Sequence, residues 1–497
     1  MILVSHAFPW REMKRKNWNV LYAGKQGVAE VICSLLDRLE PGNFLEGLSP
    51  HLAGLKGHFA FAAENGSHAV AVTDGVRSFP LFYGEGGRAG PAISNSARLL
   101  RDELNLRETD PESLLELQMA VYVTGRNTVY ENLYQMQAGE VMVRDKQKTA
   151  PERRRYFIFY DDETSDASAD DLTSELAGRT DAIFRRTAAH CSGKTVWVPL
   201  SGGLDSRLVL CKLKEHGCED LRAFSWGLPG NREAAAAQKV AKALEIPWQF
   251  VPDSGNKARE FFFSRERRRY WEFADGLNVV PNLNQICALK ELMNRGEMKP
   301  GDVVVNGQSG DFIAGAHIPS VPGPYDEQLL LDRIILKHYS HRKDLMTPES
   351  IERMRGRILA RIREHTVEPV AGEQEFAKQY ELWEWQERQA KRVVNGQRNY
   401  DFLGLGWELP LWDREYLDFW RGVPVGHKKD RRLFVNYVER FDFYGMFKNF
   451  KPRMSRWPGG RIGIQYLGHG FKLLLGPRAS RAYYEALDYF SQYGNLY

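Results

Sequence analysis

The chain has 497 residues, of which 43% are hydrophobic and 27% charged, as in ordinary globular proteins. This composition excludes a disordered or low-complexity protein, and a formal net charge of only +4 excludes one that depends on nucleic-acid charge. No run reaches the roughly 18 apolar residues of a membrane span, and no secretory leader follows Met1. We therefore expect a cytoplasmic protein with no transmembrane segment and no nucleic-acid partner.

The first 155 residues are predicted to be rich in β-strands. Short apolar runs, among them HFAFAA, HAVAVTD, PLFYG and GEVMVRD, are separated by Gly, Asn and Asp turns. The polar stretch YDDETSDASADD then separates this part from a helix predicted at 172–187. These changes place a domain boundary near residue 160.

From Thr195 onwards the pattern alternates between strands and helices. The predicted strands TVWVPL, LRAFSWG and PWQFV are separated by the helical patterns RLVLCKLKEHG and REAAAAQKVAKALE. A further strand, DVVVNG, leads into a loop that contains Asp311, and residues 373–398 are mostly helical. Alternation at this spacing predicts right-handed βαβ units and a parallel sheet, so the fold class is α/β.

The segment SGGLDS at 201–206 is the strongest functional signal. It joins the strand TVWVPL to a helix, so its amides lie at a helix N-terminus, where the helix dipole favours an anion. Its two glycines let phosphate approach the backbone, and its two serines add hydroxyl donors. Asp205 would repel phosphate unless a divalent cation lay between them, which indicates a Mg²⁺ ligand. The chain has neither a GxxxxGK[ST] nor a GxGxxG phosphate loop. The predicted phosphate-binding residues are Ser201, Gly202, Gly203, Leu204, Asp205 and Ser206.

This segment resembles the pyrophosphate loop of the ATP pyrophosphatases, enzymes that cleave ATP to AMP and pyrophosphate while they adenylate a substrate. The resemblance implies ATP and Mg²⁺ as cofactors. It also places the adenine beside the second strand, at Phe224, Ser225 and Trp226. Backbone groups of such a strand can read the adenine edge, although Trp226 is equally consistent with a core residue.

Longer stretches resemble the asparagine synthetase family. Residues 57–100 resemble its glutaminase domain, VYENLYQMQAGEVMV resembles the segment that closes that domain, and VVVNGQSGDFIAGA resembles the second synthetase loop. LPLWDREYLDFWRGVP resembles a later segment of the same family. The resemblance implies a glutaminase-like αββα sandwich at 1–160, a parallel-sheet ATP-pyrophosphatase domain at 161–470, and a tail at 471–497 packed on the second domain.

The chain departs from the family at the glutaminase nucleophile. That nucleophile is an N-terminal cysteine, but Ile2 follows Met1 here and the first cysteine is Cys33. We therefore predict that glutamine is not hydrolysed and that the first domain persists as a scaffold. The nitrogen would come from free ammonia, a separate glutaminase or an amine in the substrate.

The second synthetase loop, at 306–312, keeps one of the family's three acidic residues and lacks the other two. The resemblance makes Asp311 the second Mg²⁺ ligand and places Gly307 against the nucleotide. Gln308 is the candidate at a catalytic position where the family has a proton-accepting glutamate, although an amide cannot accept that proton as a carboxylate would. Phe312 replaces the other acid, and Glu408 stands where asparagine synthetases carry arginine. These changes argue against aspartate as the substrate.

Departing pyrophosphate needs a positive charge, and the resemblance assigns that role to a late lysine. The register is ambiguous, so Lys451 and Arg453 are both candidates. The basic run at 427–432 is interpreted as a solvated face, with a grip on an anionic substrate as the alternative. His317 follows the second loop and is either structural or part of the acceptor site.

Together these features predict a ligase that adenylates a carboxylate and transfers ammonia or an amine to it. By analogy with relatives that lack the cysteine, the carboxylate is that of a uronic acid, free or carrier-linked, in bacterial surface-polysaccharide synthesis. Two alternatives are an intramolecular amide-forming cyclase of the β-lactam or lasso-peptide type and an inactive ATP-binding scaffold. The sequence leaves a homodimer open.

Overall fold

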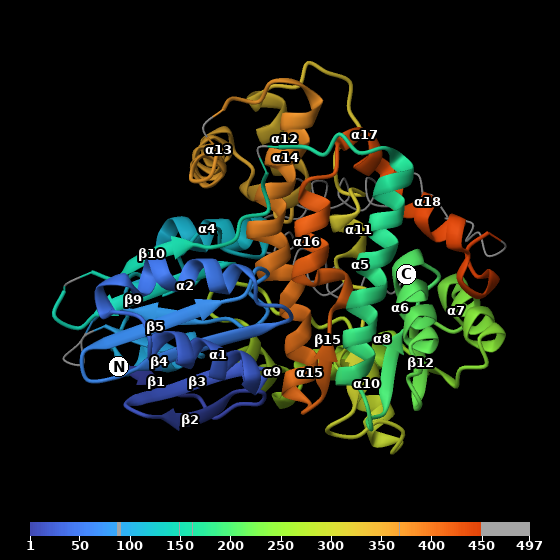
Figure 1. Cartoon of the computed structure of the whole chain (residues 1–497), viewed down its shortest axis with the longest axis horizontal. Coiled ribbons are helices and arrows are strands. Elements are labelled where there is room, and N and C mark those ends of the chain that lie inside the picture. The colour runs from blue at the N-terminus through green and yellow to red at the C-terminus, as the bar shows by residue number, and fades with distance from the viewer. Residues whose placement is uncertain (87–90, 149, 162, 367, 449–497) are drawn as a thin grey trace, which may run out of the picture.

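The computed structural model describes residues 1–86, 91–148, 150–161, 163–366 and 368–448, and its first 155 residues form two facing sheets (Figure 1). Six strands form an antiparallel sheet in the order β10-β9-β5-β4-β3-β2, and four form a second sheet in the order β1-β7-β6-β8. The strands of the first sheet are β2 (Arg11–Arg15), β3 (Trp18–Gly24), β4 (Phe59–Glu64), β5 (His68–Thr73), β9 (Glu140–Asp145) and β10 (Glu152–Arg155). Those of the second are β1 (Ile2–Leu3), β6 (Phe82–Gly84), β7 (Ala92–Ser94) and β8 (Leu133–Gln135).

Side-chain alternation along β4 shows how the layers pack. Phe59 and Phe61 belong to the core beneath α1 (Gln26–Leu36) and α2 (Phe44–Ala53), whereas Ala60 and Ala62 face the second sheet. Small residues on the inner face allow the two sheets to approach closely. Helix α3 (Ala97–Glu103) covers the far side of the second sheet. The predicted αββα sandwich is confirmed.

The second part of the chain is built on a five-stranded parallel sheet in the order β13-β12-β11-β14-β15, as the strand and helix alternation predicts. Val196 and Val198 pack toward α5, α6 and α7, whereas Trp197 between them packs toward α10 on the other face. The strands are β11 (Val196–Pro199), β12 (Leu221–Gly227), β13 (Trp248–Pro252), β14 (Val303–Val305) and β15 (Gly406–Glu408). The helices are α5 (Ala169–His190), α6 (Leu204–Glu215), α7 (Arg232–Ala243) and α10 (Ile286–Asn294).

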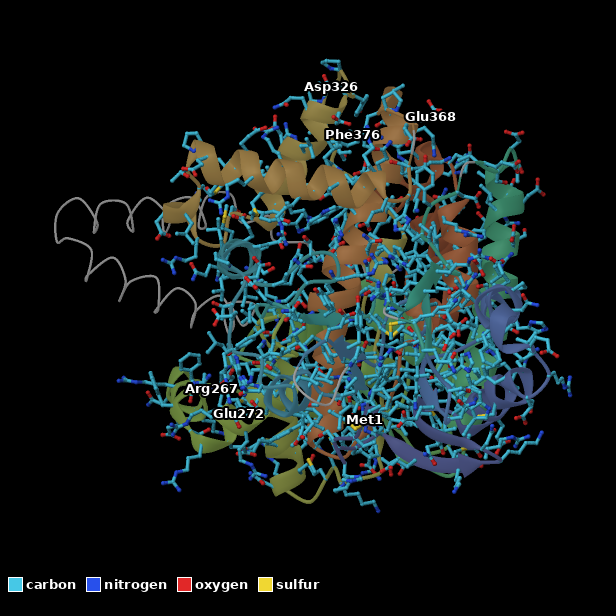
Figure 2. The ribbon with its side chains drawn as sticks, turned by 90° about the vertical axis from the view of Figure 1, so that its left-hand side faces the viewer. Met1, Arg267, Glu272, Asp326, Glu368 and Phe376 are labelled. Carbon is cyan, nitrogen blue, oxygen red and sulfur yellow. The ribbon has the colours of Figure 1, made fainter. Side chains whose placement is uncertain are left out.

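A separate helical layer lies at the top of Figure 1 and carries Asp326, Glu368 and Phe376 in Figure 2. It consists of α12 (Glu327–His338), α13 (Pro348–Arg363) and α14 (Gly372–Trp383), which share one apolar core with α4 (Pro111–Ala120) of the first part. Among the described residues, no helix is both long and apolar enough to cross a membrane.

A π-helix, η3 (Glu384–Val393), continues α14 and joins the two parts of the chain. The buried ion pair of Glu387 and Lys391 binds the first part: Lys391 Nζ donates to the carbonyl of Gly125 at 2.7 Å, and Gly125 N–H donates to Glu387 at 2.9 Å. Glu384, at the start of the same element, instead contacts His317, which follows the second loop in the sequence. Isolated π-helical turns are rare and are frequent at functional sites.

Candidate nucleotide and metal site

Two loops meet at the carboxyl end of neighbouring strands. β11 pairs directly with β14, with Val196 opposite Val303, and each strand ends in one of the two motif loops. The loop at 201–206 leads from β11 into α6, and the loop at 306–311 leads from β14 into α11 (Gly310–Ile313). Because ligands of open parallel sheets bind outside the carboxyl ends of the strands, this is where a nucleotide is expected.

The first loop is shaped by its two serines. Ser201 N–H donates to Ser206 Oγ at 3.1 Å, and Gly203 N–H donates to Ser201 Oγ at 3.1 Å. Two of the amides expected to bind phosphate are thus already paired with hydroxyls. Helix α6, however, begins at Leu204 with no side-chain cap, so the first amides of the helix have no capping acceptor. The helix N-terminus therefore offers the stronger anion site.

Two glycines of the second loop lie against Asp205. A Cβ atom on Gly307 would lie 2.9 Å from the backbone carbonyl carbon of Asp205, and one on Gly310 would lie 2.7 Å from Asp205 Oδ1. The two loops touch so closely that only glycine fits at these positions. This contact brings the neighbouring Asp311 to the same edge of the sheet as Asp205.

Arg431 forms an ion pair with the carboxylate of Asp205. Its Nη1 lies 3.1 Å from Asp205 Oδ2, and its Nη2 contacts Oδ1, so the pair is bidentate. Burial raises the pKa of Asp205 above its ordinary value, the charge of Arg431 opposes the rise, and the charge of Asp311 adds to it. The effect of the Asp311 charge on the pKa of Asp205 agrees with the close contact of the two loops.

Asp311 is held by a chain of hydrogen bonds that leads into the core. Its Oδ2 lies 3.1 Å from His317 Nε2, and His317 Nδ1 contacts the fully buried Glu384. Burial alone would raise the pKa of Asp311, but the hydrogen bond and charge of His317 outweigh it and lower the pKa to about 2. Burial likewise opposes protonation of His317, but its hydrogen bonds with both acids raise the pKa of the imidazole.

The donor set suits Mg²⁺ rather than a metal held by protein alone. Among the described residues, no cluster of three or more His, Cys, Asp or Glu side chains could hold an ion. Asp205 and Asp311 supply two carboxylates, and Mg²⁺ is commonly bound through one or two carboxylates, substrate phosphates and water. The residues present thus fit the predicted metal, which Asp205 and Asp311 would hold.

Gln308 positions the second loop. Its Nε2 donates to the carbonyl of Val393 at 2.7 Å, and its Oε1 accepts from Gln397 Nε2 at 2.7 Å. Both ends of the amide are therefore engaged by the last residue of η3 and the segment that follows it. This arrangement suits a positioning residue, whereas we predicted Gln308 among the catalytic positions.

The predicted adenine strand lies in β12, beside β11. Phe224 is fully buried, and its carbonyl accepts from Leu200 N–H at 2.8 Å, so its ring is not available to a nucleotide. Ser225 Oγ donates to the carbonyl of Leu200 at 2.6 Å. Trp226 is half-buried at the carboxyl end of the strand and packs on the core cluster around Phe224. Trp226 is therefore the most accessible side chain of the three, and adenine contact at this strand stays a prediction.

The basic run at 427–432 is not a solvated face, and this interpretation was wrong. Lys428 is buried and pairs with Glu381 at 2.8 Å, Lys429 pairs with Glu373, and Arg431 pairs with Asp205. Hydropathy could not reveal this, because the acids that pair with these cations lie at distant positions in the sequence.

The remaining substitutions in the sequence have structural roles. Phe312 is buried within an aromatic cluster with Phe159 and Trp412, where an acid would be unpaired. Glu408 lies 3.4 Å from His190 Nδ1 of α5, and burial raises the pKa of the Glu408 carboxyl.

Cys33 is buried in α1, and burial raises the pKa of its thiol to about 11, which does not suit a nucleophile. Lys451, Arg453 and the tail at 471–497 lie outside the described residues.

A family model for asparagine synthase matches residues 185–433, which is half of the chain and includes both loops and Arg431. The chain belongs to the asparagine synthase family. The matched region includes every described residue that we predicted to bind the nucleotide or metal. Residues 1–184 lie outside the match, and no curated protein matches this asparagine synthase family member.

Solved structures show only a slight likeness to this family member. One is described as the allosteric regulatory enzyme of purine biosynthesis, with 12% identity, 61% of this chain and 57% of that chain covered, and a TM-score of 0.20. Another is a glutamine phosphoribosylpyrophosphate amidotransferase from B. subtilis, complexed with ADP and GMP. The identity is 13%, the match covers 61% of this chain and 58% of that chain, and the TM-score is 0.19. The chain thus spans under two thirds of either protein, and the fold described above rests on its own strands and helices.

We expect replacement of His317 by glutamine to destabilise the protein in a pH-dependent way. Because folding raises the pKa of His317, its contribution is complete below about pH 6.5 and is lost as the pH rises through the raised value. Hydrogen bonds to charged groups are each worth about 1.5–3 kcal/mol, so His317→Gln should lower Tm clearly at pH 6 and less at pH 9. His6→Gln is the control, since His6 is exposed. An equal loss of Tm at both pH values would contradict a protonated His317.

Proposed function

We propose that this protein is an ATP-dependent, amide-forming ligase that cleaves ATP to AMP and pyrophosphate. The contact of the two loops carries the proposal, because it brings Asp205 and Asp311 together at the carboxyl ends of β11 and β14. Membership of the asparagine synthase family supports a carbon–nitrogen ligase in general terms.

The proposed reaction begins with the phosphates of ATP at the amino end of α6. Asp205 and Asp311 would hold Mg²⁺, which when bound neutralises charge on the phosphate oxygens. A carboxylate oxygen of the substrate attacks the α-phosphorus, and the bond to the bridging oxygen of pyrophosphate breaks. The nitrogen of ammonia or an amine then attacks the acyl carbon, loses a proton and releases AMP.

Arg431 is the described cation best placed to stabilise pyrophosphate, a role that we first predicted for Lys451 or Arg453. It already lies at the carboxylate of Asp205, where the phosphates must approach. Removal of one preorganised donor to developing charge typically lowers kcat about 10²- to 10³-fold. We expect Arg431→Ala to lower pyrophosphate formation by about this factor and Arg432→Ala, an exposed neighbour, to leave it unchanged. Equal rates for the two variants would remove Arg431 from the proposal.

The nitrogen donor is proposed to be ammonia or an amine rather than glutamine. Cys33, in the core between α1 and the six-stranded sheet, is buried, and burial raises the pKa of its thiol to about 11, which does not suit a nucleophile. For the acceptor we propose a uronic acid, free or carrier-linked. Its support is the resemblance to relatives that lack the cysteine, together with the loss of the family acids at Gln308 and Phe312.

A pyrophosphate-release assay tests this proposal. The purified protein, Mg²⁺ and ATP are combined with glucuronic or galacturonic acid, their nucleotide-linked forms, aspartate or a peptide, each with ammonium chloride, glutamine or no nitrogen source. We expect release with a uronic acid and ammonium, and none with glutamine as the donor. Turnover without added nitrogen would favour the intramolecular cyclase. ATP binding without pyrophosphate release from any acceptor would favour the inactive scaffold.

A further inference from the structure

A pocket between the two parts of the chain lies apart from the candidate site. It has a cavity volume of about 140 Å³, and its lining comes from segments of the sandwich near Ala7, Arg77 and Asn95 and from α9 (Arg265–Ala274), Asn278, Asn395 and Arg398 of the second part. Figure 2 views the molecule from the side on which Glu272 of α9, one of the lining residues, lies.

Arg77 is a buried cation of this pocket and is only 3% exposed. Its Nε donates to the carbonyl of Met136 at 2.8 Å, and its Nη1 reaches the carbonyl of Ala390 at 3.4 Å. Its Nη2 is buried with no hydrogen-bond partner among the described residues. The backbone of Arg77 has φ 55°, a left-handed conformation that disfavours a long side chain, so the guanidinium is retained at a conformational cost.

Among the described residues, Arg77 forms no ion pair with either acid of the lining, Asp275 or the exposed Glu272. Arg98 binds both oxygens of Asp275, at 3.2 and 2.5 Å. Arg398 Nη2 lies 2.8 Å from Asp401, and its Nε is another buried atom with no hydrogen-bond partner in the described part of the chain. Burial and the charge of Arg398 lower the pKa of Arg77 to about 9, although the charges of Glu387 and Glu140 oppose the shift, so Arg77 is charged at neutral pH. An unpaired buried charge is strongly destabilising unless something neutralises it.

We propose that this pocket binds the carboxylate or phosphate group of a small molecule through Arg77, with Arg398 beside it. Guanidinium groups match the geometry of both oxyanions, and a bound anion would supply the partner that Arg77 Nη2 lacks. Asn95 and Asn278 add polar side chains to the lining, and Phe82 adds an apolar one. The chemistry thus selects a small organic anion with a compact apolar body.

The pocket also touches the segment that holds the second loop. Asn395 and Arg398 line it, and Gln397 between them donates to Gln308 Oε1 at 2.7 Å. An anion in the pocket would therefore contact the same short segment that fixes Gln308. The binding itself does not depend on the proposed ligase activity.

Calorimetric titration with inorganic phosphate and, separately, acetate tests the proposal. Arg77→Met removes the anchor, and Ala7→Trp fills the pocket while it leaves Arg77 in place. A Ser201→Ala, Ser206→Ala double variant alters only the nucleotide loop, where phosphate could also bind. Arg107→Gln, an exposed arginine outside the pocket, is the matched control.

We expect at least one of the two anions to bind the wild type, the loop variant and the control, and to bind Arg77→Met and Ala7→Trp at least tenfold more weakly. In anion-free buffer, Arg77→Met should melt at or above the Tm of the wild type, because an unpaired buried charge is gone. If Arg77→Met does not fold, Ala7→Trp decides. The proposal is overturned if neither anion binds the wild type, or if both pocket variants bind as it does. Loss of binding in the loop variant alone would also overturn it, while the proposed function would stand.

Discussion

Replacement of Asp205 by alanine is expected to lower pyrophosphate formation by about 10³-fold or more, which corresponds to about 4 kcal/mol of transition-state stabilisation. The variant loses one of the two carboxylates that would hold Mg²⁺, and it frees Arg431 from its bidentate partner. The predicted loss is therefore in turnover and in the Mg²⁺ dependence of ATP binding. It is measured by initial rates of pyrophosphate release over a range of Mg²⁺ concentrations.

Asp170→Ala is the matched control for this substitution. Asp170 is 91% exposed, and its ion pair with Arg440 lies at the surface, where such pairs contribute little. Circular dichroism of both variants shows whether the fold survives. A folded Asp205→Ala protein with near-normal rates would contradict the assignment of the metal site.

The second large effect is expected from Gly307→Ala. The added Cβ would lie 2.9 Å from the carbonyl carbon of Asp205 and 3.0 Å from Ser206 N, so the two loops must move apart. Displacement of about 1 Å in a positioned site can cost about 10²-fold in rate. We expect a loss of this size in pyrophosphate release and weaker binding of ATP, because Asp205 and the amino end of α6 shift together.

Gly178→Ala provides the comparison. Gly178 is exposed in the middle of α5, and a Cβ there meets nothing within 4 Å. Alanine is the better helix former by roughly 0.5–1 kcal/mol, so this variant should be as active as the wild type and slightly more stable. If Gly307→Ala behaved like Gly178→Ala, contact between the loops would not matter for function.

The fold followed from local patterns in the sequence. The apolar run TVWVPL lies in β11, and the alternation of large and small residues in HFAFAA matches the two faces of β4. The αββα order and the parallel order of the strands came from the family resemblance and from the chirality rule for βαβ units. The division of the chain at residue 160 remains a proposal, although it falls between β10 and α5.

The site was predictable only where it is continuous in sequence. The two loops were found because strand, glycine and acid follow one another in the sequence. Arg431, however, lies 226 residues from its partner Asp205, and Glu384 lies 67 residues from its partner His317. Glu384 lies in a helical pattern that looks like an amphipathic surface, and only the fold shows that it is buried behind His317. Long-range pairing of charges leaves no periodic signal in one sequence.

The fate of a carboxylate oxygen tests the central claim most directly. The uronic acid that supports turnover is labelled with ¹⁸O in its carboxylate and incubated with the protein, Mg²⁺, ATP and ammonium chloride. Attack on the α-phosphorus places one labelled oxygen in AMP for each amide formed, which mass spectrometry detects. Label in inorganic phosphate with ADP as the other product, or unlabelled AMP, would show that the two loops do not direct adenylation.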